Sequence, residues 1–448
     1  MQVHFIAIGG AAMHNLALAL HQKGYHISGS DDAIFEPSKG RLEKAGILPE
    51  VMGWFPERIH SDLDAIILGM HARKDNPELL KAQELGLAIY SYPEYLYEQS
   101  KDKKRVVIGG SHGKTTITSM VLHVLNMCGV ETDYMVGAQL DGFETMVKLS
   151  DAPLIILEGD EYLSSPIDLR PKFHLYKPHI ALLSGVAWDH INVFPTFENY
   201  LEQFKIFIDC IESDGFLTFC SEDEHLQSIC KGNSDYRVSA YSLPDFRIED
   251  GKTYLRHSWG ESTLEIFGNH NLLNMMGALN LCKEIGISDQ AFFKAMESFK
   301  GASRRLEKIQ EREGLTVYKD FAHSPSKVKA TVKAVKEQFS NRKVIAALEL
   351  HTFSSLNEEF LKEYKGAMDA SDTALVFYDP KAVAHKKLKE LDKETVFRSF
   401  DRSDLEVFDQ GVSCLDKVKA EIDDSSIVLL MSSGDFGGCN MDDFAKKL

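Results

Sequence analysis

The sequence predicts an α/β protein of three domains, each built on a parallel or mostly parallel sheet. Apolar segments of strand length alternate with segments of helical periodicity along the chain. Several apolar segments run directly into glycine-rich or acidic turns, and ligands bind at such strand ends in open α/β sheets. The 448 residues also exceed what one hydrophobic core usually supports. We expect a Rossmann-like N-terminal domain over residues 1–103, a central P-loop ATPase-like parallel-sheet domain over 104–299 and a Rossmann-like C-terminal domain over 300–448.

Composition narrows the possible partners. The chain carries 50 basic and 67 acidic residues, a formal charge of −17, which argues against a nucleic-acid partner. No apolar run reaches the ~18 residues of a membrane span, and the chain opens in a strand-like segment without a leader. The seven cysteines are scattered without C-x-x-C spacing, which is typical of reduced thiols. We therefore expect a cytoplasmic protein, monomeric or weakly dimeric.

The first domain opens with a strand that enters a turn at Gly9 and Gly10. A helix and a second strand follow, and the second strand ends at Ser30 and Asp31. An acidic residue about 20 positions after the glycines is typical of Rossmann sheets that bind a ribose hydroxyl. The turn lacks the G-x-G-x-x-G spacing, so it favours a nucleotide or nucleotide-sugar over a dinucleotide. A plain βαβ core without a ligand is the alternative.

A later strand over residues 65–69 leads into a polar loop that contains Arg73. Because this loop follows the carboxyl end of a strand, we expect it to face a bound substrate. The charged stretch 101–105 then marks the junction with the second domain.

The most informative segment is a glycine loop between a strand over residues 105–109 and a helix over 117–127. The loop consists of Gly110, Ser111, His112, Gly113, Lys114, Thr115 and Thr116. Glycines let backbone N–H groups turn toward a phosphate, the helix N-terminus adds positive potential, and a lysine adds a point charge. The threonine beside the lysine can reach a magnesium ion on the phosphates. The loop is shorter than G-x-x-x-x-G-K-[ST], but its setting predicts a phosphate site; a chance glycine turn is the alternative.

Two further strand ends of the central domain carry polar residues. Glu158 and Glu161 end an apolar strand, where carboxylates commonly hold magnesium against a nucleotide, although a solvated turn would look the same. Asp189 and His190 follow the next strand and could orient an imidazole or bind a metal. Such a pair is more often structural.

The same domain contains two helices with polar residues. A helix over residues 197–207 contains Lys205. A later helix opens with Asn271 and Asn274, whose spacing of three places both amides on one face. That arrangement suits either a ligand contact or helix capping.

Three strands of the third domain end in polar segments. One leads to Asp320 and His323, a second over residues 344–348 leads to His351, and the last leads to the glycine-rich segment 432–438. Strands that alternate with helices in this way indicate a parallel or mostly parallel sheet.

The ordered motifs resemble one family. Along the chain stand G-x-H-G-K-T-T, E-x-D-E, a D-H pair and G-x-H-N-x-x-N, followed by R-R-L-E, D-F-A-H-x-P and M-S-x-G-x-F-G-G. This set resembles the Mur ligases, the ATP-dependent amide-forming enzymes of peptidoglycan assembly. The resemblance covers essentially the whole chain, and seven motifs in order are far more specific than any one of them.

The resemblance implies roles around ATP and Mg²⁺. Lys114 would hold the β- and γ-phosphates, and Thr115 with Glu158 would bind the first Mg²⁺. Glu161 is the competitor for that ligand role. His190 would hold a second Mg²⁺ or the substrate carboxylate.

Further nucleotide contacts are implied from the third domain and the helix before it. Arg305, in the R-R-L-E motif, would reach the γ-phosphate. Asn271 and Asn274 would contact adenine, while Asp320 and His323 would lie at the nucleotide, Asp320 on the ribose. Because Arg305 and Asp320 lie in a different domain from the phosphate loop, the site would form only when the domains close.

The resemblance also implies the substrates. The glycine turn with Ser30, Asp31 and Arg73 would bind UDP-N-acetylmuramate, whose lactoyl carboxylate ATP would convert to an acyl phosphate. The loop at His351 would face the amine. The third-domain motifs favour L-alanyl-γ-D-glutamyl-meso-diaminopimelate, a recycled peptide, as amino donor, and L-alanine alone is the alternative.

Some positions depart from the family pattern. Gly185 stands where the family has an asparagine, four residues before Asp189. Lys205 lies fifteen residues after His190, the spacing of a lysine that several family members carbamylate to bridge the second Mg²⁺. An ordinary surface lysine is the alternative. The segment at His351 replaces an arginine-containing loop, so the amine donor is the substrate least constrained by the resemblance.

Two other functions are compatible with part of the sequence. A non-catalytic regulator that binds a nucleotide or UDP-sugar would keep the fold, but Lys114, Glu158 and His190 are all present. An NAD-dependent dehydrogenase would explain the first domain and leave the phosphate loop without a role.

Overall fold

The computed structural model describes residues 1–448 except 140–142, 190–192, 231–234 and 303–304. Two units of dense internal packing divide the chain. The first comprises Met1–Ser242 with Gly277–Phe292, and the second comprises Leu243–Met276 with Phe293–Leu448. Parallel sheets dominate both units, which confirms the predicted α/β class. The exact boundaries of three domains stay a prediction.

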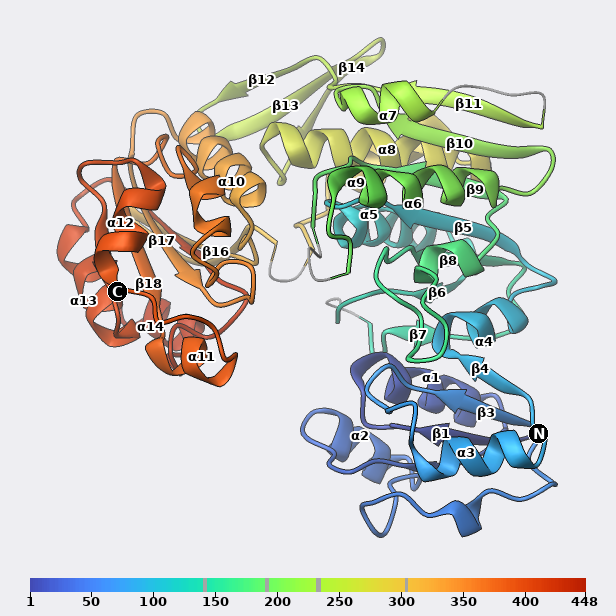
Figure 1. The fold of residues 1–448 in the computed structure, drawn as a ribbon. Helices are drawn as coiled ribbons and strands as arrows, with labels where there is room; N and C mark the ends of the chain where they lie inside the picture. The colour runs from blue at the N-terminus through green and yellow to red at the C-terminus, as the bar shows by residue number, and fades with distance from the viewer. Residues whose placement is uncertain (140–142, 190–192, 231–234, 303–304) are drawn as a thin grey trace. The chain divides into compact units, whose positions relative to one another are not determined.

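The N-terminal part of the first unit is a four-stranded parallel sheet in the order β2-β1-β3-β4 (Figure 1). Its strands are β1 Gln2–Ile6, β2 His26–Ser30, β3 Ala65–Leu68 and β4 Ile89–Ser91. Its helices are α1 Ala11–Gln22, α2 Ser38–Lys44, α3 Pro77–Glu84 and α4 Tyr92–Glu98. Strand β1 ends two residues earlier than the apolar run suggests, because Ala7 turns the chain with φ +68°.

A seven-stranded sheet forms the rest of the first unit, in the order β11-β10-β9-β5-β8-β6-β7, with only the last pair antiparallel. Its strands are β5 Lys104–Gly109, β6 Asp133–Met135, β7 Val147–Lys148, β8 Leu154–Glu158, β9 Ile180–Leu183, β10 Gly215–Cys220 and β11 Tyr236–Tyr241. Its helices include α5 Lys114–Met127, α6 Phe197–Asp209 and α7 Glu224–Ile229. The central strands are continuous apolar runs because both of their faces are covered.

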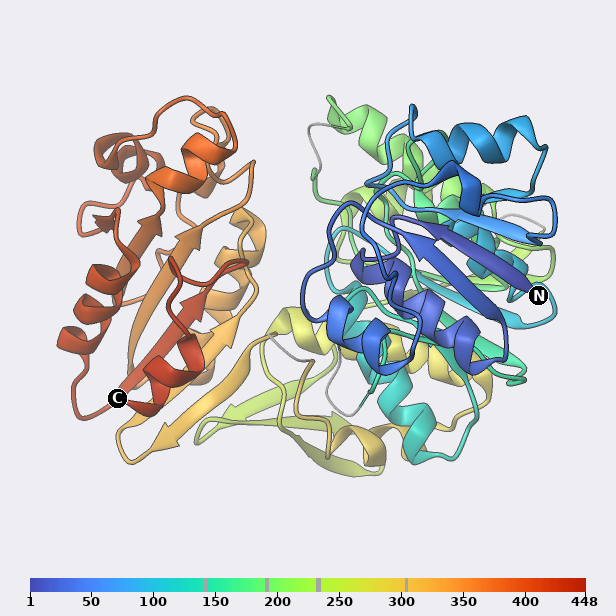
Figure 2. The same ribbon diagram turned by 90° about the horizontal axis from the view of Figure 1, so that it is seen from below.

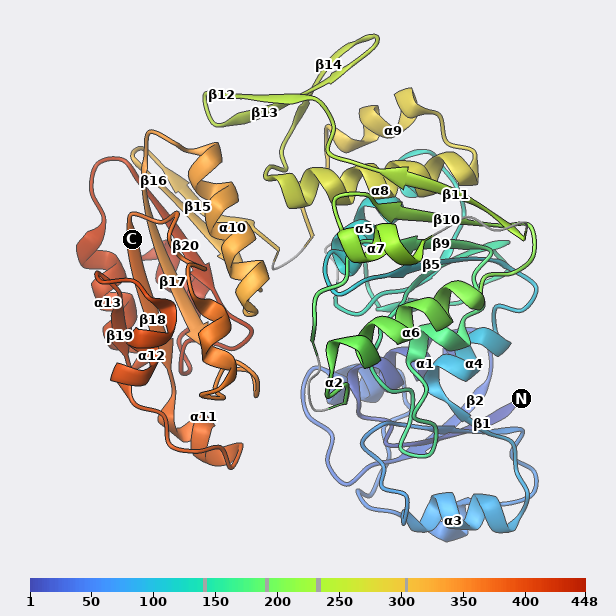
Figure 3. The same ribbon diagram turned by 45° about the horizontal axis from the view of Figure 1, so that its top comes forward.

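A small antiparallel meander opens the second unit (Figure 3). Its strands are β12 Phe246–Glu249, β13 Lys252–His257 and β14 Gly260–Leu264. Two helices follow in sequence, α8 Asn269–Ile285 and α9 Asp289–Met296, and both continue across the boundary between the units.

The second unit is completed by a six-stranded sheet in the order β15-β16-β20-β17-β18-β19, in which only β15 is antiparallel. Its strands are β15 Glu307–Arg312, β16 Leu315–Asp320, β17 Lys343–Leu350, β18 Thr373–Tyr378, β19 Glu406–Phe408 and β20 Ser426–Met431. Its helices are α10 Pro325–Gln338, α11 Pro380–His385, α12 Lys393–Phe400, α13 Gly411–Glu421 and α14 Met441–Lys446.

Helices lie on both sides of this sheet (Figure 2). Two separate hydrophobic cores cover its two faces, one against α10 and α12 and the other against α13 and α14. Strand β16 is followed by α10 on one face, and its neighbour β20 is followed by α14 on the opposite face. The two loops therefore leave neighbouring strands in opposite directions. In open α/β sheets a ligand crevice forms at such a point.

Strand β17 is longer than the sequence suggests. We expected it over residues 344–348, but it continues through Leu350 and so includes Glu349. In a sequence, a charged residue after an apolar run suggests that the strand has ended. The carboxylate of Glu349 is instead buried inside the fold. Within the part of the chain that the structure describes, no helix is long and apolar enough to cross a membrane.

Candidate functional site

The glycine loop at 110–116 connects β5 to α5 in a conformation that requires glycine. Gly110 has φ +129° and Gly113, which precedes the first residue of α5, has φ +81°. A Cβ at Gly110 would lie 2.1 Å from Ser184 Oγ, an impossible approach. The local sequence thus produces the strand–turn–helix geometry of a phosphate cradle.

Lys114 lies over this loop and is mostly buried. Its Nζ donates to Gly110 O at 2.6 Å and to Glu161 Oε2 at 2.6 Å. Burial works against the charge, but Glu161, Asp160 and Glu158 together raise the pKa of Lys114. The lysine is therefore charged at neutral pH, and a phosphate group would compete with Glu161 for it.

Thr115 and Glu158 form a pair of oxygen ligands beside the loop. Thr115 Oγ1 donates to Glu158 Oε1 at 2.7 Å, and Gly137 N donates to Oε2 at 2.8 Å. Burial raises the pKa of Glu158, although Gly137, Thr115 and Lys114 act in the opposite direction.

These two side chains fit Mg²⁺, which prefers hard oxygen ligands. Among the described residues, no group of three or more His, Cys, Asp or Glu side chains could hold a metal ion. Mg²⁺ is usually held by one or two protein ligands together with phosphate oxygens and water, so Thr115 and Glu158 suit that ion better than a closed metal site. Of the other two predicted ligands, Glu161 accepts from Lys114, and His190 lies outside the described residues.

Glu161 is held by a residue that the sequence analysis missed. The Tyr200 hydroxyl, from α6, donates to Glu161 Oε1 at 3.0 Å and bonds with Ser111 Oγ at 2.7 Å. Burial raises the pKa of Tyr200, so its hydroxyl keeps its proton. The only sequence signal is a tyrosine on the apolar face of α6, which must find a hydrogen-bond partner when buried.

Lys205, on the same helix, lies at the surface. Its ammonium pairs with Glu202 at 2.9 Å, and about half of each side chain is exposed. This environment corresponds to the surface-lysine alternative, and the carbamate stays a prediction without structural support.

The glycine turn and the end of β2 come together in the N-terminal sheet. Gly9 N donates to Asp31 Oδ2 at 2.7 Å, so this carboxylate already holds the turn. Ser30 Oγ accepts from Arg58 at 3.2 Å, a contact between residues 28 positions apart that the sequence did not indicate. Gly10 immediately precedes α1. Arg73 is exposed and pairs locally with Asp75.

In the second unit, Asp320 ends β16 and is buried. Its carboxylate accepts from Leu306 N at 2.5 Å and from Ala322 N at 2.6 Å. Burial raises the pKa of Asp320, with Arg305 and these two N–H groups opposing that effect. Arg304, which precedes Arg305 in the R-R-L-E motif, lies outside the described residues.

Arg305 and His323 meet at the same end of β16 around one aromatic ring. The Arg305 guanidinium lies 4.9 Å from the centre of the Phe321 ring. The His323 ring lies edge to face with the Phe321 ring at 5.1 Å between the ring centres, and His323 Nδ1 lies 2.8 Å from the backbone oxygen of Phe321. The structure thus brings together three of the predicted nucleotide-binding residues, Arg305, Asp320 and His323.

The two predicted adenine contacts lie in the first turns of α8. Asn271 Nδ2 donates to Phe267 O at 3.0 Å, so the amide contacts the backbone before the helix. Asn274 follows one turn later on the same face. A cap and a ligand contact are both compatible with this placement.

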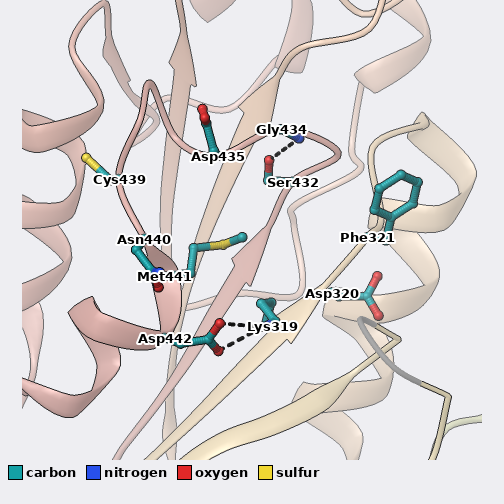
Figure 4. A pocket seen from close by; sticks show the side chains of 10 residues that line it. All are labelled: Lys319, Asp320, Phe321, Ser432, Gly434, Asp435, Cys439, Asn440, Met441 and Asp442. Carbon is teal, nitrogen blue, oxygen red and sulfur yellow. Dashed lines mark hydrogen bonds and ion pairs between the residues drawn. The ribbon is translucent and has the colours of Figure 1, made fainter. Parts of the chain in front are cut away.

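A pocket of about 170 Å³ lies at the carboxyl ends of β16 and β20, where the two loops diverge (Figure 4). The side chains and backbone that line it belong to Lys319, Asp320, Phe321, Ser432, Gly434, Asp435, Cys439, Asn440, Met441 and Asp442. Lys319 Nζ pairs with Asp442 at 2.8 Å across one end of it. Of these residues, only Asp320 was predicted from the sequence as a site residue.

His351 follows β17 directly, and two-fifths of its side chain is exposed. Its Nδ1 lies 3.6 Å from Glu349 Oε1. A Cβ at Gly434 would come within 2.7 Å of His351 Nδ1, so the segment after β17 packs directly against the loop after β20.

Three family models match the chain one after another. They are described as the Mur ligase family catalytic domain over residues 2–104, the Mur ligase middle domain over 108–282 and the Mur ligase glutamate ligase domain over 304–434.

Individual ligases and solved ligase structures are similar to the chain over most of its length. The UDP-N-acetylmuramate–L-alanine ligase of Carboxydothermus hydrogenoformans is 32% identical over 376 residues, covering 81% of this chain and 79% of the relative. The UDP-N-acetylmuramate–alanine ligase structure from Thermotoga maritima covers both chains completely at 20% identity, with a TM-score of 0.71. A murein peptide ligase structure from Psychrobacter arcticus covers 100% of this chain and 98% of its own at 21% identity, with a TM-score of 0.64. The two structures show the shared three-domain α/β fold.

Proposed function

Because the chain belongs to the Mur ligase family and is an ATP-dependent ligase that forms amide bonds, we propose that it joins the lactoyl carboxylate of UDP-N-acetylmuramate to the amine of L-alanine. The observation that supports ATP-driven chemistry most directly is the glycine loop with the charged, buried Lys114 beside the Thr115–Glu158 pair. The names of the curated relatives favour L-alanine over the peptide that the third-domain motifs favour.

The reaction needs ATP because a carboxylate has no usable leaving group. A carboxylate oxygen attacks the γ-phosphorus of ATP, the bond to the β-phosphate oxygen breaks, and ADP leaves. The ammonium group of the donor loses a proton, and the free amine then attacks the carbonyl carbon of the acyl phosphate. The tetrahedral intermediate loses a second proton from the nitrogen, expels inorganic phosphate and leaves the amide. Each step moves negative charge, so positioning and cationic stabilisation should dominate catalysis.

The residues of the first unit would bind and orient the phosphates. The N–H groups of the glycine loop and the α5 N-terminus would bind phosphate oxygens, and Lys114 would exchange its contact with Glu161 for one with the γ-phosphate. Thr115 and Glu158 would hold Mg²⁺, which when bound neutralises charge on the phosphates. The glycine turn at Gly9 would hold the UDP-sugar.

The residues of the second unit would bind nucleotide and amine. Arg305, Asp320 and His323 form the candidate nucleotide contacts. We propose that the pocket at the ends of β16 and β20 takes the amine donor, because Asp435 in its lining can pair with a ligand that arrives as an ammonium ion. Asp442, also in the lining, is already paired with Lys319, and Asp320 borders both the pocket and the candidate nucleotide contacts.

The peptide L-alanyl-γ-D-glutamyl-meso-diaminopimelate is the second candidate donor. It is favoured by the segments at His323 and at 431–438, which resemble those of family members that use this peptide. Ser432, Gly434 and Asp435 of the second segment line the pocket, which supports the peptide as a candidate donor.

Phosphate release from ATP tests the proposal. The purified chain with UDP-N-acetylmuramate should release phosphate only when an amine is added, and L-alanine should support more release than the peptide. Lys114→Ala should lower the rate by about a hundredfold or more, whereas Lys101→Ala, at an exposed surface pair, should not. Release with the peptide alone would make the second candidate the donor. No release with either amine would refute the ligase assignment.

A further inference from the structure

One buried carboxylate in the second unit has no role in the reaction described so far. Glu349 lies on β17 and is 1% exposed. Its Oε2 accepts the Ser432 hydroxyl and also Phe436 N, the latter at 2.8 Å. Gly434 N in turn donates to Ser432 Oγ at 2.7 Å. A single carboxylate therefore fixes both ends of the loop 432–436, which forms one wall of the pocket.

The loop continues into three residues whose backbone conformation has to be stabilised by other contacts. Phe436, Gly437 and Gly438 have φ of +50°, +69° and +89°, three left-handed residues in succession. The left-handed conformation costs a non-glycine residue such as Phe436 free energy, so it persists only where contacts enforce it. The hydrogen bond from Phe436 N to Glu349 and the buried ring of Phe436, stacked against Phe377, supply those contacts.

The wall also packs tightly against the segment after β17. A Cβ at Gly434 would lie 2.7 Å from His351 Nδ1 and 2.9 Å from Glu349 Oε2. Glu349 Oε1 faces His351 Nδ1 at 3.6 Å. The same carboxylate thus borders the loop after β20 and the His351 segment that the sequence analysis expected to face the amine.

We propose that Glu349 is a positioning residue for the amine donor: its buried carboxylate holds Ser432 and Gly434 in the conformation that forms the pocket wall. The inference rests on the proposed function, in which this pocket takes the amine. Burying a charged carboxylate is costly, and here the cost is offset by hydrogen bonds to the loop. Glu349 itself does not line the pocket, so it would act through the loop.

Steady-state kinetics of two Glu349 variants tests this assignment. Glu349→Ala removes both hydrogen bonds and should raise KM for the amine by about tenfold or more. KM for ATP and for UDP-N-acetylmuramate should stay within about twofold, because the loop 432–436 is assigned to neither ligand. The carboxylate of Asp320, which is assigned to the nucleotide, is held by Leu306 N and Ala322 N and not by Glu349. In Glu349→Gln the amide oxygen can take the place of Oε2 and accept both donors, so this variant should recover most of the affinity for the amine.

Glu421, the last residue of α13, provides a control at the other end of β17. It pairs with Lys343, the first residue of that strand, at 2.9 Å, and its side chain is partly exposed. Glu421→Gln should leave all three KM values unchanged. Should Glu349→Ala fail to fold, Ser432→Ala should still raise KM for the amine alone, because it removes the hydrogen bond from Ser432 to Glu349 and the one that Ser432 Oγ accepts from Gly434 N.

Three results would overturn the inference. One is a Glu349→Ala enzyme with an unchanged KM for the amine, and another is a variant in which all three KM values rise together, as in general loss of structure. The third is a Glu349→Gln enzyme as impaired as the alanine variant, since the hydrogen-bond role would then be wrong. An inactive wild type would refute the proposed function itself, which separates the two failures.

Discussion

The substitution Gly110→Ala tests whether the backbone of the phosphate loop determines nucleotide binding. Gly110 combines φ +129° with an approach to Ser184 that leaves no room for a Cβ: Oγ would lie at 2.1 Å and the backbone N at 2.9 Å. The side-chain oxygen could rotate away, but the backbone nitrogen cannot move without shifting β9. The loop itself should therefore move.

The cost has two parts. An unfavourable left-handed conformation costs about 1–3 kcal/mol, and forcing an extra methyl group into a packed site costs about 1–3 kcal/mol. The free energy of unfolding should fall by about 2–6 kcal/mol if the loop keeps its conformation. If the loop relaxes instead, the loss of stability will be smaller, and KM for ATP should rise by about tenfold or more because the N–H groups no longer converge.

Gly129, just beyond the other end of α5, is the matched control. It has φ +69°, but a Cβ there would meet nothing within 4 Å. Gly129→Ala should therefore cost only about 1–2 kcal/mol and leave KM for ATP unchanged. Urea titration and ATP-dependent phosphate release measure both variants. A Gly110→Ala enzyme with wild-type stability and wild-type KM for ATP would refute the argument.

Three further predictions follow from buried and exposed charges. Arg105→Ala should lower the free energy of unfolding in urea by about 2–4 kcal/mol, because its buried guanidinium pairs with Glu212 and donates to several backbone carbonyls; a loss below about 1 kcal/mol would contradict this. Burial raises the pKa of Asp320 above its ordinary value of 3.8. As pH rises from 3.8 through the raised pKa, the free energy of unfolding of the wild type should therefore fall relative to that of Asp320→Asn. A difference between the two proteins that does not change with pH would contradict this. Lys205→Ala should keep kcat within about twofold, as expected for a surface pair. A hundredfold loss of kcat in this variant, together with a wild-type activity that depends on bicarbonate, would instead support the carbamate.

Local features of this fold could be predicted from the sequence. The alternation of apolar strands and helices identified the α/β class, and the glycine loop was recognisable because strand, turn, lysine and helix are consecutive residues. The predicted strand ends were wrong where a residue lies in a backbone conformation that is unusual for its type. Ala7 turns the chain although it continues an apolar run, and Glu349 stays in a strand although it is charged.

The contacts that organise the candidate site are mostly long-range. Tyr200 meets Glu161, Arg58 meets Ser30, and each pair is separated by 28 or more residues. Their partners are determined by how the strands pair and the helices pack, which residue spacing does not reveal. The sequence therefore predicted which strand ends carry the chemistry, but not the side chains that support them.

Oxygen transfer from the carboxylate to phosphate tests the central claim most directly. UDP-N-acetylmuramate labelled with ¹⁸O in its lactoyl carboxylate would be incubated with the chain, ATP and L-alanine, and the released phosphate analysed by mass spectrometry. If an acyl phosphate forms and the amine displaces phosphate, one labelled oxygen should appear in each phosphate released, together with ADP and the amide. Phosphate without the label would show that ATP is hydrolysed by water, and the proposed mechanism would be wrong.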